Sequence, residues 1–172
     1  SRVQELESSR DAVALPGLVR SVAVIVPSRL LWDGENEPGK TFAKDTTVVE
    51  RRAVDLVLKL ERELGRTPTE MARNNKGFDI RSVNSEGQVY FIEVKGRIDG
   101  ADTFTITSPE VSFAQDQGDR HRLALVRVSS EDASLDEARY ITHPFDHVIP
   151  SLTTASYNEK WSAYWDRGGA PV

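Results

Sequence analysis

The hydrophobic residues between Thr47 and Leu64 recur at helical spacing. Apolar positions that repeat every three to four residues form one face of an amphipathic helix. Thr47, followed three residues later by Glu50, matches a capping box, and Gly65 is suited to end the helix. We therefore predict a long helix over residues 47–64. Its apolar face comprises Val49, Ala53, Leu56, Val57, Leu60 and Leu64.

Shorter apolar segments after this helix are typical of β-strands. Residues 78–84 and 88–95 flank a three-residue turn that ends in Gly87, which predicts a hairpin. Further strands are expected over 103–107, 123–128 and 140–142, and helices over 108–117 and within the aromatic tail 151–172. The order of helix, hairpin, strand, helix and strand predicts a layered α/β architecture.

The residues before the long helix have a different composition. Val22–Val26 is a short β-branched run closed by Pro27, and it predicts a buried strand. The segment Asp33–Lys40 is rich in glycine, proline and charge, which is typical of a linker. We therefore expect an extension and linker over 1–45 that ends a preceding module, a compact domain over 46–150, and a tail or helix over 151–172.

Composition narrows the functional classes. The chain has 172 residues, of which 38% are hydrophobic and 28% charged, as in ordinary globular domains. Its net charge of −5 excludes a strongly basic nucleic-acid binder as a description of the whole chain, although a local basic face is compatible with it. The absence of cysteine excludes disulfide frameworks, cysteine-based zinc sites and thiol nucleophiles. Because we find no signal peptide and no apolar run of membrane-spanning length, we expect a cytoplasmic protein.

The candidate chemistry lies in the predicted hairpin. If the two strands pair symmetrically about the turn, Asp79 lies directly opposite Glu93, and opposed residues share a face of the sheet. Lys95, two residues beyond Glu93, points to the same face. Two carboxylates, the backbone carbonyl of Val94 and water molecules supply the oxygen ligands that Mg²⁺ or Mn²⁺ prefers. Lys95 can then orient or deprotonate a water that attacks phosphorus, while the metal stabilises charge on the phosphate.

Two interpretations of these residues stay open. Asp79, Glu93 and Lys95 can form an ordinary cross-strand charge cluster, although opposed carboxylates repel each other unless a cation lies between them. Glu50 lies at the border of the apolar face of the helix. There it can add a carboxylate to the site, through water or a second metal, or it can serve only to complete the capping box.

Lysine and arginine are concentrated in the middle of the chain, whereas acidic residues dominate over 131–137. Lys76, Arg81 and Arg97 lie close in sequence to the candidate site, and we expect them to contact nucleic-acid phosphates. Solvated helix faces explain much of the same concentration of positive charge.

The blocks Gly77–Ser82 and Phe91–Gly96, continued by Ile106–Glu110 and Leu123–Val126, resemble the NO VEIN C-terminal domain. That family is similar to the PD-(D/E)XK, or restriction-endonuclease-like, nuclease superfamily. The resemblance covers about residues 48–130 and implies a mixed central β-sheet flanked by helices. The chain departs from the wider superfamily at residues 66–70, where a strand is often found and where this sequence predicts a turn or a short helix.

The resemblance also implies roles for individual residues. Asp79, Glu93 and Lys95 match the metal and catalytic positions of the superfamily, and Glu50 matches a helical glutamate that many members carry. The implied function is hydrolysis of phosphodiester bonds in DNA with Mg²⁺ or Mn²⁺. The implied partner is a helicase module, in the same or a partner chain of a restriction or phage-defence protein. A non-cleaving DNA-binding or sensing module and a structural appendage of a helicase stay open as alternatives, and RNA fits the residues as well as DNA does.

Overall fold

The computed structural model describes residues 38–73, 75, 77–150 and 153–172, and Lys40–Val172 forms a compact unit. The strand expected over Val22–Val26 lies outside the described residues, as do residues 33–37 of the expected linker. Within the described part of the chain, no helix is long and apolar enough to cross a membrane.

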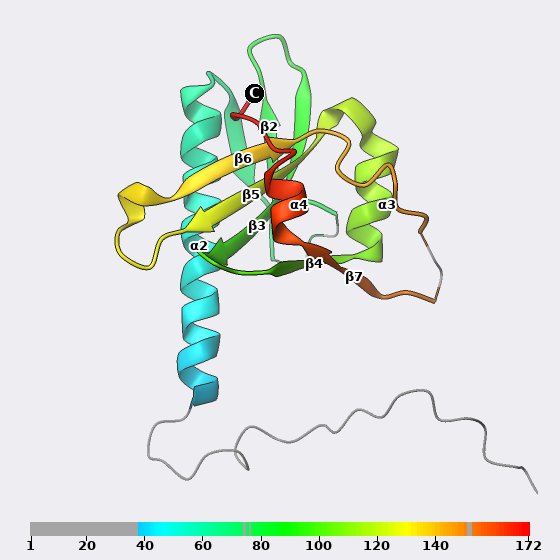
Figure 1. Cartoon of the computed structure of the whole chain (residues 1–172). Helices are drawn as coiled ribbons and strands as arrows, with labels where there is room; N and C mark the ends of the chain where they lie inside the picture. Colours follow the sequence, from blue (N-terminus) through cyan, green and yellow to red (C-terminus); the bar gives the residue numbers. More distant parts are fainter. Residues whose placement is uncertain (1–37, 74, 76, 151–152) are drawn as a thin grey trace, which may run out of the picture. The chain divides into compact units, whose positions relative to one another are not determined.

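A five-stranded mixed sheet lies at the centre of the unit (Figure 1). In spatial order its strands are β1 (Thr67–Glu70), β2 (Ile80–Val83), β3 (Val89–Ile98), β5 (His121–Val128) and β6 (Glu137–Ile141). Strands β3 and β5 are parallel, whereas the other neighbouring pairs are antiparallel. A parallel pair requires a crossover connection, which here contains a strand and a helix.

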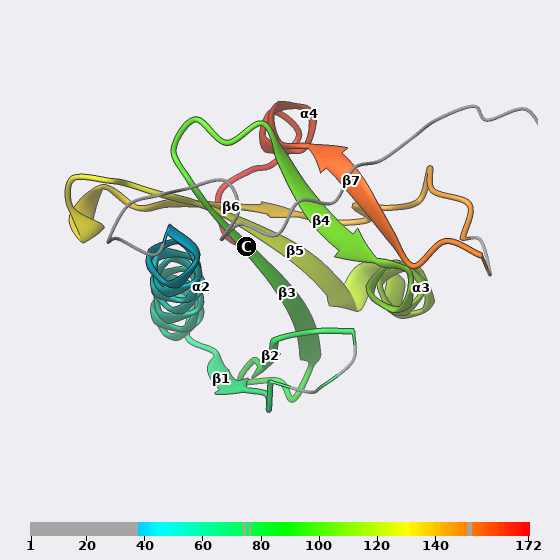
Figure 2. The same cartoon turned by 90° about the horizontal axis from the view of Figure 1, so that it is seen from below.

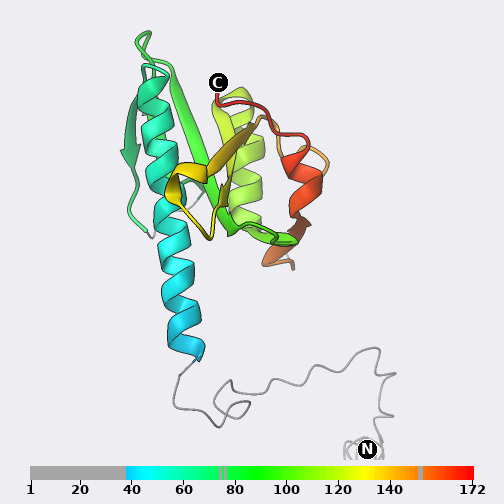
Figure 3. The same cartoon turned by 60° about the vertical axis from the view of Figure 1, so that its left-hand side comes forward.

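Helices and a second, smaller sheet cover the two faces of the central sheet (Figures 2 and 3). The long helix α2 (Pro38–Glu63) packs on one face. The opposite face is covered by β4 (Thr103–Thr107), α3 (Ser108–Gln117), β7 (Ser156–Lys160) and α4 (Trp161–Trp165), and β4 pairs with β7. The predicted mixed sheet flanked by helices is therefore confirmed.

Strand β5 is buried on both faces because it lies between two hydrophobic clusters. Ala124 and Val126 belong to the cluster beneath α2, whereas Leu123 and Leu125 belong to the cluster beneath α3 and α4. This alternation follows from the two-residue period of a strand. The central part of β5, Leu123–Val126, is apolar at every position because side chains on both faces of the strand are buried.

The long helix begins earlier than predicted. Helix α2 starts at Pro38, so Thr47 and Glu50 lie inside it, and the predicted capping box at its start is wrong. Proline is favoured in the first turn of a helix because its φ angle suits the helix and its missing N–H is not needed there. Residues 38–40, which we assigned to a linker, are the first residues of this helix.

The segment after the long helix was also predicted wrongly. Residues 66–70 were expected to form a turn or a short helix, but Thr67–Glu70 forms β1 and pairs antiparallel with β2. Pro68 cannot donate a backbone hydrogen bond, which is tolerated because β1 lies at the edge of the sheet.

The hairpin register agrees with the prediction. Ile80 pairs with Ile92 and Val83 with Val89, which is the symmetric pairing about the turn. Gly87 in that turn has a φ of 82°, a left-handed value that glycine adopts without strain. Because the pairing is symmetric about the turn, the residues just before Ile80 lie opposite the residues just after Ile92.

The aromatic tail forms a strand and a short helix rather than a single helix. Tyr157 lies in β7, opposite Ile106 of β4. Trp161, Tyr164 and Trp165 of α4 are buried in the same hydrophobic cluster as β4 and α3. Large aromatic side chains contribute strongly to a core, so the tail stabilises the layer that carries α3.

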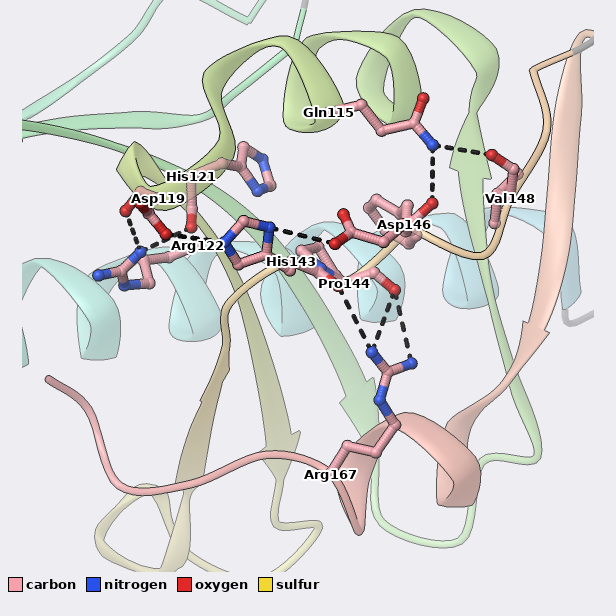
Figure 4. A network of polar contacts seen from close by, with 10 residues as sticks. Gln115, Asp119, His121, Arg122, His143, Pro144, Asp146, Val148 and Arg167 are labelled. Atoms are coloured by element: carbon pink, nitrogen blue, oxygen red, sulfur yellow. Dashed lines mark hydrogen bonds and ion pairs between the residues drawn. The ribbon is translucent and has the colours of Figure 1, made fainter.

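Polar contacts join the loop after β6 to the C-terminal half of α3 and to the turn that follows α3 (Figure 4). The side-chain amide of Gln115 donates hydrogen bonds to the carbonyl oxygens of Phe145 (2.7 Å) and Val148 (2.8 Å). His143 has an unusual φ of 49°, and its Nε2 lies 2.8 Å from a carboxylate oxygen of Asp119. These contacts anchor α3 at the end away from its first turn.

Candidate active site

Asp79 lies one residue before β2, at the point where the hairpin ladder ends. Its backbone N–H donates to the carbonyl of Ile92 (2.9 Å), and its carbonyl accepts from the N–H of Met71 (2.8 Å). Its side-chain Oδ2 accepts from the N–H of Val94 (2.8 Å). Asp79 is thus fixed through both its backbone and its carboxylate, and the carboxylate reaches along the edge of β3.

The edge of β3 that faces Asp79 pairs with β2 only as far as Ile92. At Val94 the N–H on that edge bonds to the Asp79 side chain in place of a strand. The N–H and C=O of one strand residue point toward the same edge. The carbonyl of Val94 is therefore directed toward the side of β3 on which Asp79 lies, as the predicted metal site requires.

Glu93 and Lys95 lie on the face of β3 opposite the α2 layer. The side chain of Glu93 is only 3% exposed, and its Oε1 lies 2.6 Å from the Nζ of Lys95. The same ammonium lies 3.2 Å from Oε1 of Glu110, in the first turn of α3. Lys95 is therefore shared between two carboxylates that come from different layers of the fold.

Burial dominates the electrostatics of the two hairpin carboxylates. It raises the pKa of Glu93 well above its ordinary value, although the charge of Lys95 opposes the change. Burial also raises the pKa of Asp79, although the hydrogen bond from Val94 and the charge of Lys95 oppose it. Each of these two ionised groups is thus destabilised without additional positive charge, which a bound cation would provide.

The lysine and the third carboxylate are both held in their charged forms. Burial alone would lower the pKa of Lys95, but Glu93 and Glu110 outweigh it and raise that pKa above its ordinary value. Burial alone would raise the pKa of Glu110, but the charge of Lys95 and the hydrogen bond from Thr107 bring that pKa below its ordinary value.

A pocket of about 620 Å³ brings the predicted residues together. Asp79, Glu93, Val94 and Lys95 line it, and Glu50 lines it from α2. The pocket wall is formed by the hairpin, by α2 and by the first turn of α3. The site therefore lies at the edge of β3 beyond Ile92, where β2 no longer pairs with it. Spacing along one strand could not predict such a pocket, because its walls depend on tertiary packing.

Glu50 lies in this pocket with a partner that the sequence did not indicate. Its Oε2 is 3.3 Å from the Nη2 of Arg73, and both side chains are largely exposed. Its charge contributes to the raised pKa of Asp79, so the two carboxylates interact across the pocket. Because α2 begins well before Thr47, Glu50 has no capping role at the start of the helix.

The structure places two of the three residues that we expect to contact nucleic acid. Arg97 lines the pocket, and its guanidinium donates to the carbonyls of Thr103 (3.2 Å) and Gly96 (3.1 Å). Arg81 is exposed on β2 and does not line the pocket. Lys76 lies outside the described residues.

The donor set fits a hard divalent cation that retains water. Among the described residues, no three Asp, Glu or His side chains are arranged to hold a metal ion together. Mg²⁺ is usually bound by one or two carboxylates and keeps several water ligands, so Asp79, Glu93 and the Val94 carbonyl suffice for it. The raised pKa values of both carboxylates are consistent with a site that is completed by positive charge.

Comparisons with known proteins gave one match to a family model and a match to a solved structure. The family model described as "Protein NO VEIN, C-terminal" matches residues 49–141. Hjc, a Holliday junction resolvase from Archaeoglobus fulgidus, has a similar structure, with a TM-score of 0.46 and 16% sequence identity over 70% of this chain and 89% of that chain. A search of curated proteins found no match.

Proposed function

This chain belongs to the NO VEIN C-terminal family, and we propose that its pocket hydrolyses phosphodiester bonds in DNA with the help of Mg²⁺ or Mn²⁺. One observation carries the proposal. The carboxylates of Asp79 and Glu93 and the ammonium of Lys95 line one pocket at the open edge of the central strand. Without a cation, such carboxylates would repel a phosphate, so their presence argues against a site built only for binding DNA.

The pocket residues divide into ligands and a proton-handling group. Asp79, Glu93 and the carbonyl of Val94 would hold the metal, and Glu50 would add a carboxylate through water. When bound, the metal would polarise the phosphate and stabilise the charge that develops on it. Lys95 carries no ligand oxygen and is held in its charged form, so its ammonium is available to donate a hydrogen bond to the attacking water or a proton to the leaving oxygen.

Positive charge around the pocket would position the DNA. Arg97 lies on the pocket wall, and Arg73 extends from the loop before Asp79 with its side chain 84% exposed. Arg81 on β2 and Lys76, which precedes Asp79 closely in sequence, would add further contacts. Arginine contacts to phosphate oxygens fix the orientation of a nucleic acid without selecting its sequence.

The larger context is part of the same proposal and rests on the family resemblance. The domain over 46–150 would act as the nuclease of a cytoplasmic restriction or phage-defence protein. The residues before α2 would connect it to a helicase module, and residues 151–172 would complete it as a C-terminal segment.

The proposal is tested by incubating the purified full chain with plasmid DNA, linear duplex, single-stranded DNA and RNA. Each substrate is assayed with Mg²⁺, with Mn²⁺ and with EDTA. We expect cleavage of at least one DNA substrate that depends on the metal. Metal-independent DNA binding without cleavage of any substrate would favour the alternative, a non-catalytic DNA-binding or sensing module.

A further inference from the structure

Lys95 forms ion pairs with two carboxylates that have different further roles. The Lys95 ammonium lies 2.6 Å from Glu93 Oε1 and 3.2 Å from Glu110 Oε1. Glu93 is a neighbour of Lys95 on β3, and it is one of the residues we propose as a metal ligand. Glu110 belongs to α3 and is separated from Lys95 by a complete strand, β4.

Glu110 is itself held rigidly. Its Oε2 accepts a hydrogen bond from the backbone N–H of Thr107 (2.6 Å), and its own N–H donates to the Thr107 hydroxyl (3.4 Å). This is a complete capping box at the start of α3. Val111 and Ala114 of the same helix are buried in the core. One oxygen of Glu110 is thus committed to the helix, and the other is directed at Lys95.

We propose that Glu110 is a positioning residue. It would keep the Lys95 ammonium in place when the Glu93 carboxylate shares its charge with a bound metal ion. This inference rests on the proposed function. A glutamate that shares its charge with a divalent cation is a weaker partner for a lysine. Lysine has a flexible four-carbon stem, and without a second fixed partner its ammonium would sample many positions.

The simpler interpretation is that Glu110 only caps α3, and two variants separate the two roles. Glu110→Gln keeps the length of the side chain and its capping oxygen, because glutamine also serves in a capping box. It removes the negative charge that faces Lys95. Thr107→Val does the reverse, since it removes the hydroxyl that caps Glu110 but leaves the Glu110 carboxylate beside Lys95.

The activity test is a double-mutant cycle on the full chain with Mg²⁺ and a cleaved DNA substrate. We expect Glu110→Gln to lower kcat about 10- to 100-fold while KM and the melting temperature change little. In a Lys95→Ala background, the same change should have no further effect, because Glu110 acts through Lys95. Thr107→Val should lower the melting temperature and leave kcat near that of the wild type. Equal, additive losses of kcat from Glu110→Gln in both backgrounds would overturn the proposal.

A second measurement does not depend on activity. Nuclear relaxation of the Lys95 ¹³Cε, assigned with Lys95→Arg, reports the mobility of the side chain. In the wild type we expect a restricted side chain with and without Mg²⁺. In Glu110→Gln we expect it to be restricted without Mg²⁺ and mobile once Mg²⁺ is added. A Lys95 side chain that is equally restricted in both proteins with Mg²⁺ would overturn the positioning role, even if no DNA is cleaved and the nuclease proposal itself fails.

Discussion

The Asp79 carboxylate accepts a hydrogen bond of 2.8 Å from the backbone N–H of Val94. A side chain thereby takes the position that a neighbouring strand would otherwise occupy on this edge of β3. The bond holds the carboxylate at Val94, whose carbonyl points toward the same edge because the N–H and C=O of a strand residue face one side of the strand. The metal ligands that we propose are therefore arranged around one backbone position.

Replacing Asp79 tests this arrangement. Asp79→Asn keeps an oxygen that can accept from Val94 but removes the charge, and Asp79→Ala removes both. We expect both variants to bind Mg²⁺ at least about tenfold more weakly and to lose cleavage, because a ligand charge is lost in each. Isothermal titration with Mg²⁺ measures the affinity. Wild-type affinity in Asp79→Ala would show that Asp79 is not a ligand.

The stability of the metal-free protein should decrease as the pH rises above about 4. Burial raises the pKa of Asp79 and of Glu93, so in this range the folded state binds more protons than the unfolded state. The free energy of unfolding that these two groups contribute therefore falls as the pH rises toward their folded-state values. The lowered pKa of Glu110 acts in the opposite sense, and its contribution is lost as the pH falls through its folded-state value.

Urea unfolding in EDTA between pH 4 and about pH 8 measures this dependence. Asp79→Asn should make the free energy of unfolding decrease less steeply with pH, because one of the two carboxyl groups with a raised pKa is then absent. Asp116→Asn, at an exposed position of α3, is the matched control and should leave the slope as in the wild type. The same slope in all three proteins would contradict the assignment of buried, mutually repelling carboxylates.

Gly96 is expected to be essential for the packing of α2 against the site. A Cβ at this position would lie 2.6 Å from the Cβ of Ala53 and 3.2 Å from the carbonyl oxygen of Val49. Gly96→Ala should therefore destabilise the fold by about 1–3 kcal/mol, as overpacking of a core does. Gly169→Ala is the control, because a Cβ there would meet nothing within 4 Å. Equal melting temperatures of the two variants would contradict this packing.

DNA binding should weaken steeply as the salt concentration rises, because contacts to phosphates release counterions. Arg97→Ala should reduce the slope of log affinity against log salt by about one. Arg62→Ala changes an exposed arginine in the last turn of α2 and should leave the slope unchanged. Binding that does not depend on salt, or the same slope in all three proteins, would count against a phosphate contact at Arg97.

The sequence was sufficient to predict the hairpin register, because a short turn at Gly87 fixes which residues oppose each other. The parity of strand residues then placed Glu93 and Lys95 on one face. The helix over 108–117 was also predicted, because its pattern depends only on residues that are close in the chain. These successes share one property, since each depends on contacts within a short stretch of chain.

Two of the failures depend on tertiary contacts, and one depends on a local pattern that fits two positions in a helix. The proline at position 68 indicated a turn, but an edge strand tolerates it. The spacing of Thr47 and Glu50 is as compatible with the middle of a helix as with its start. The contact of Lys95 with Glu110 had no sequence pattern, because β4 and α3 must fold back over β3 before the two side chains meet.

The most direct test compares cleavage rates of the wild type, Lys95→Ala and Lys59→Ala on one DNA substrate with Mg²⁺. Lys59 is an exposed lysine of α2 whose Nζ lies 3.8 Å from Oε1 of Glu63, so Lys59→Ala is the matched control. We predict that wild type and Lys59→Ala cleave at similar rates, and that Lys95→Ala is at least about 100-fold slower while it still binds Mg²⁺ and DNA. Cleavage by Lys95→Ala at the wild-type rate would contradict the assigned site, and a wild type inactive with every divalent metal would contradict the nuclease function.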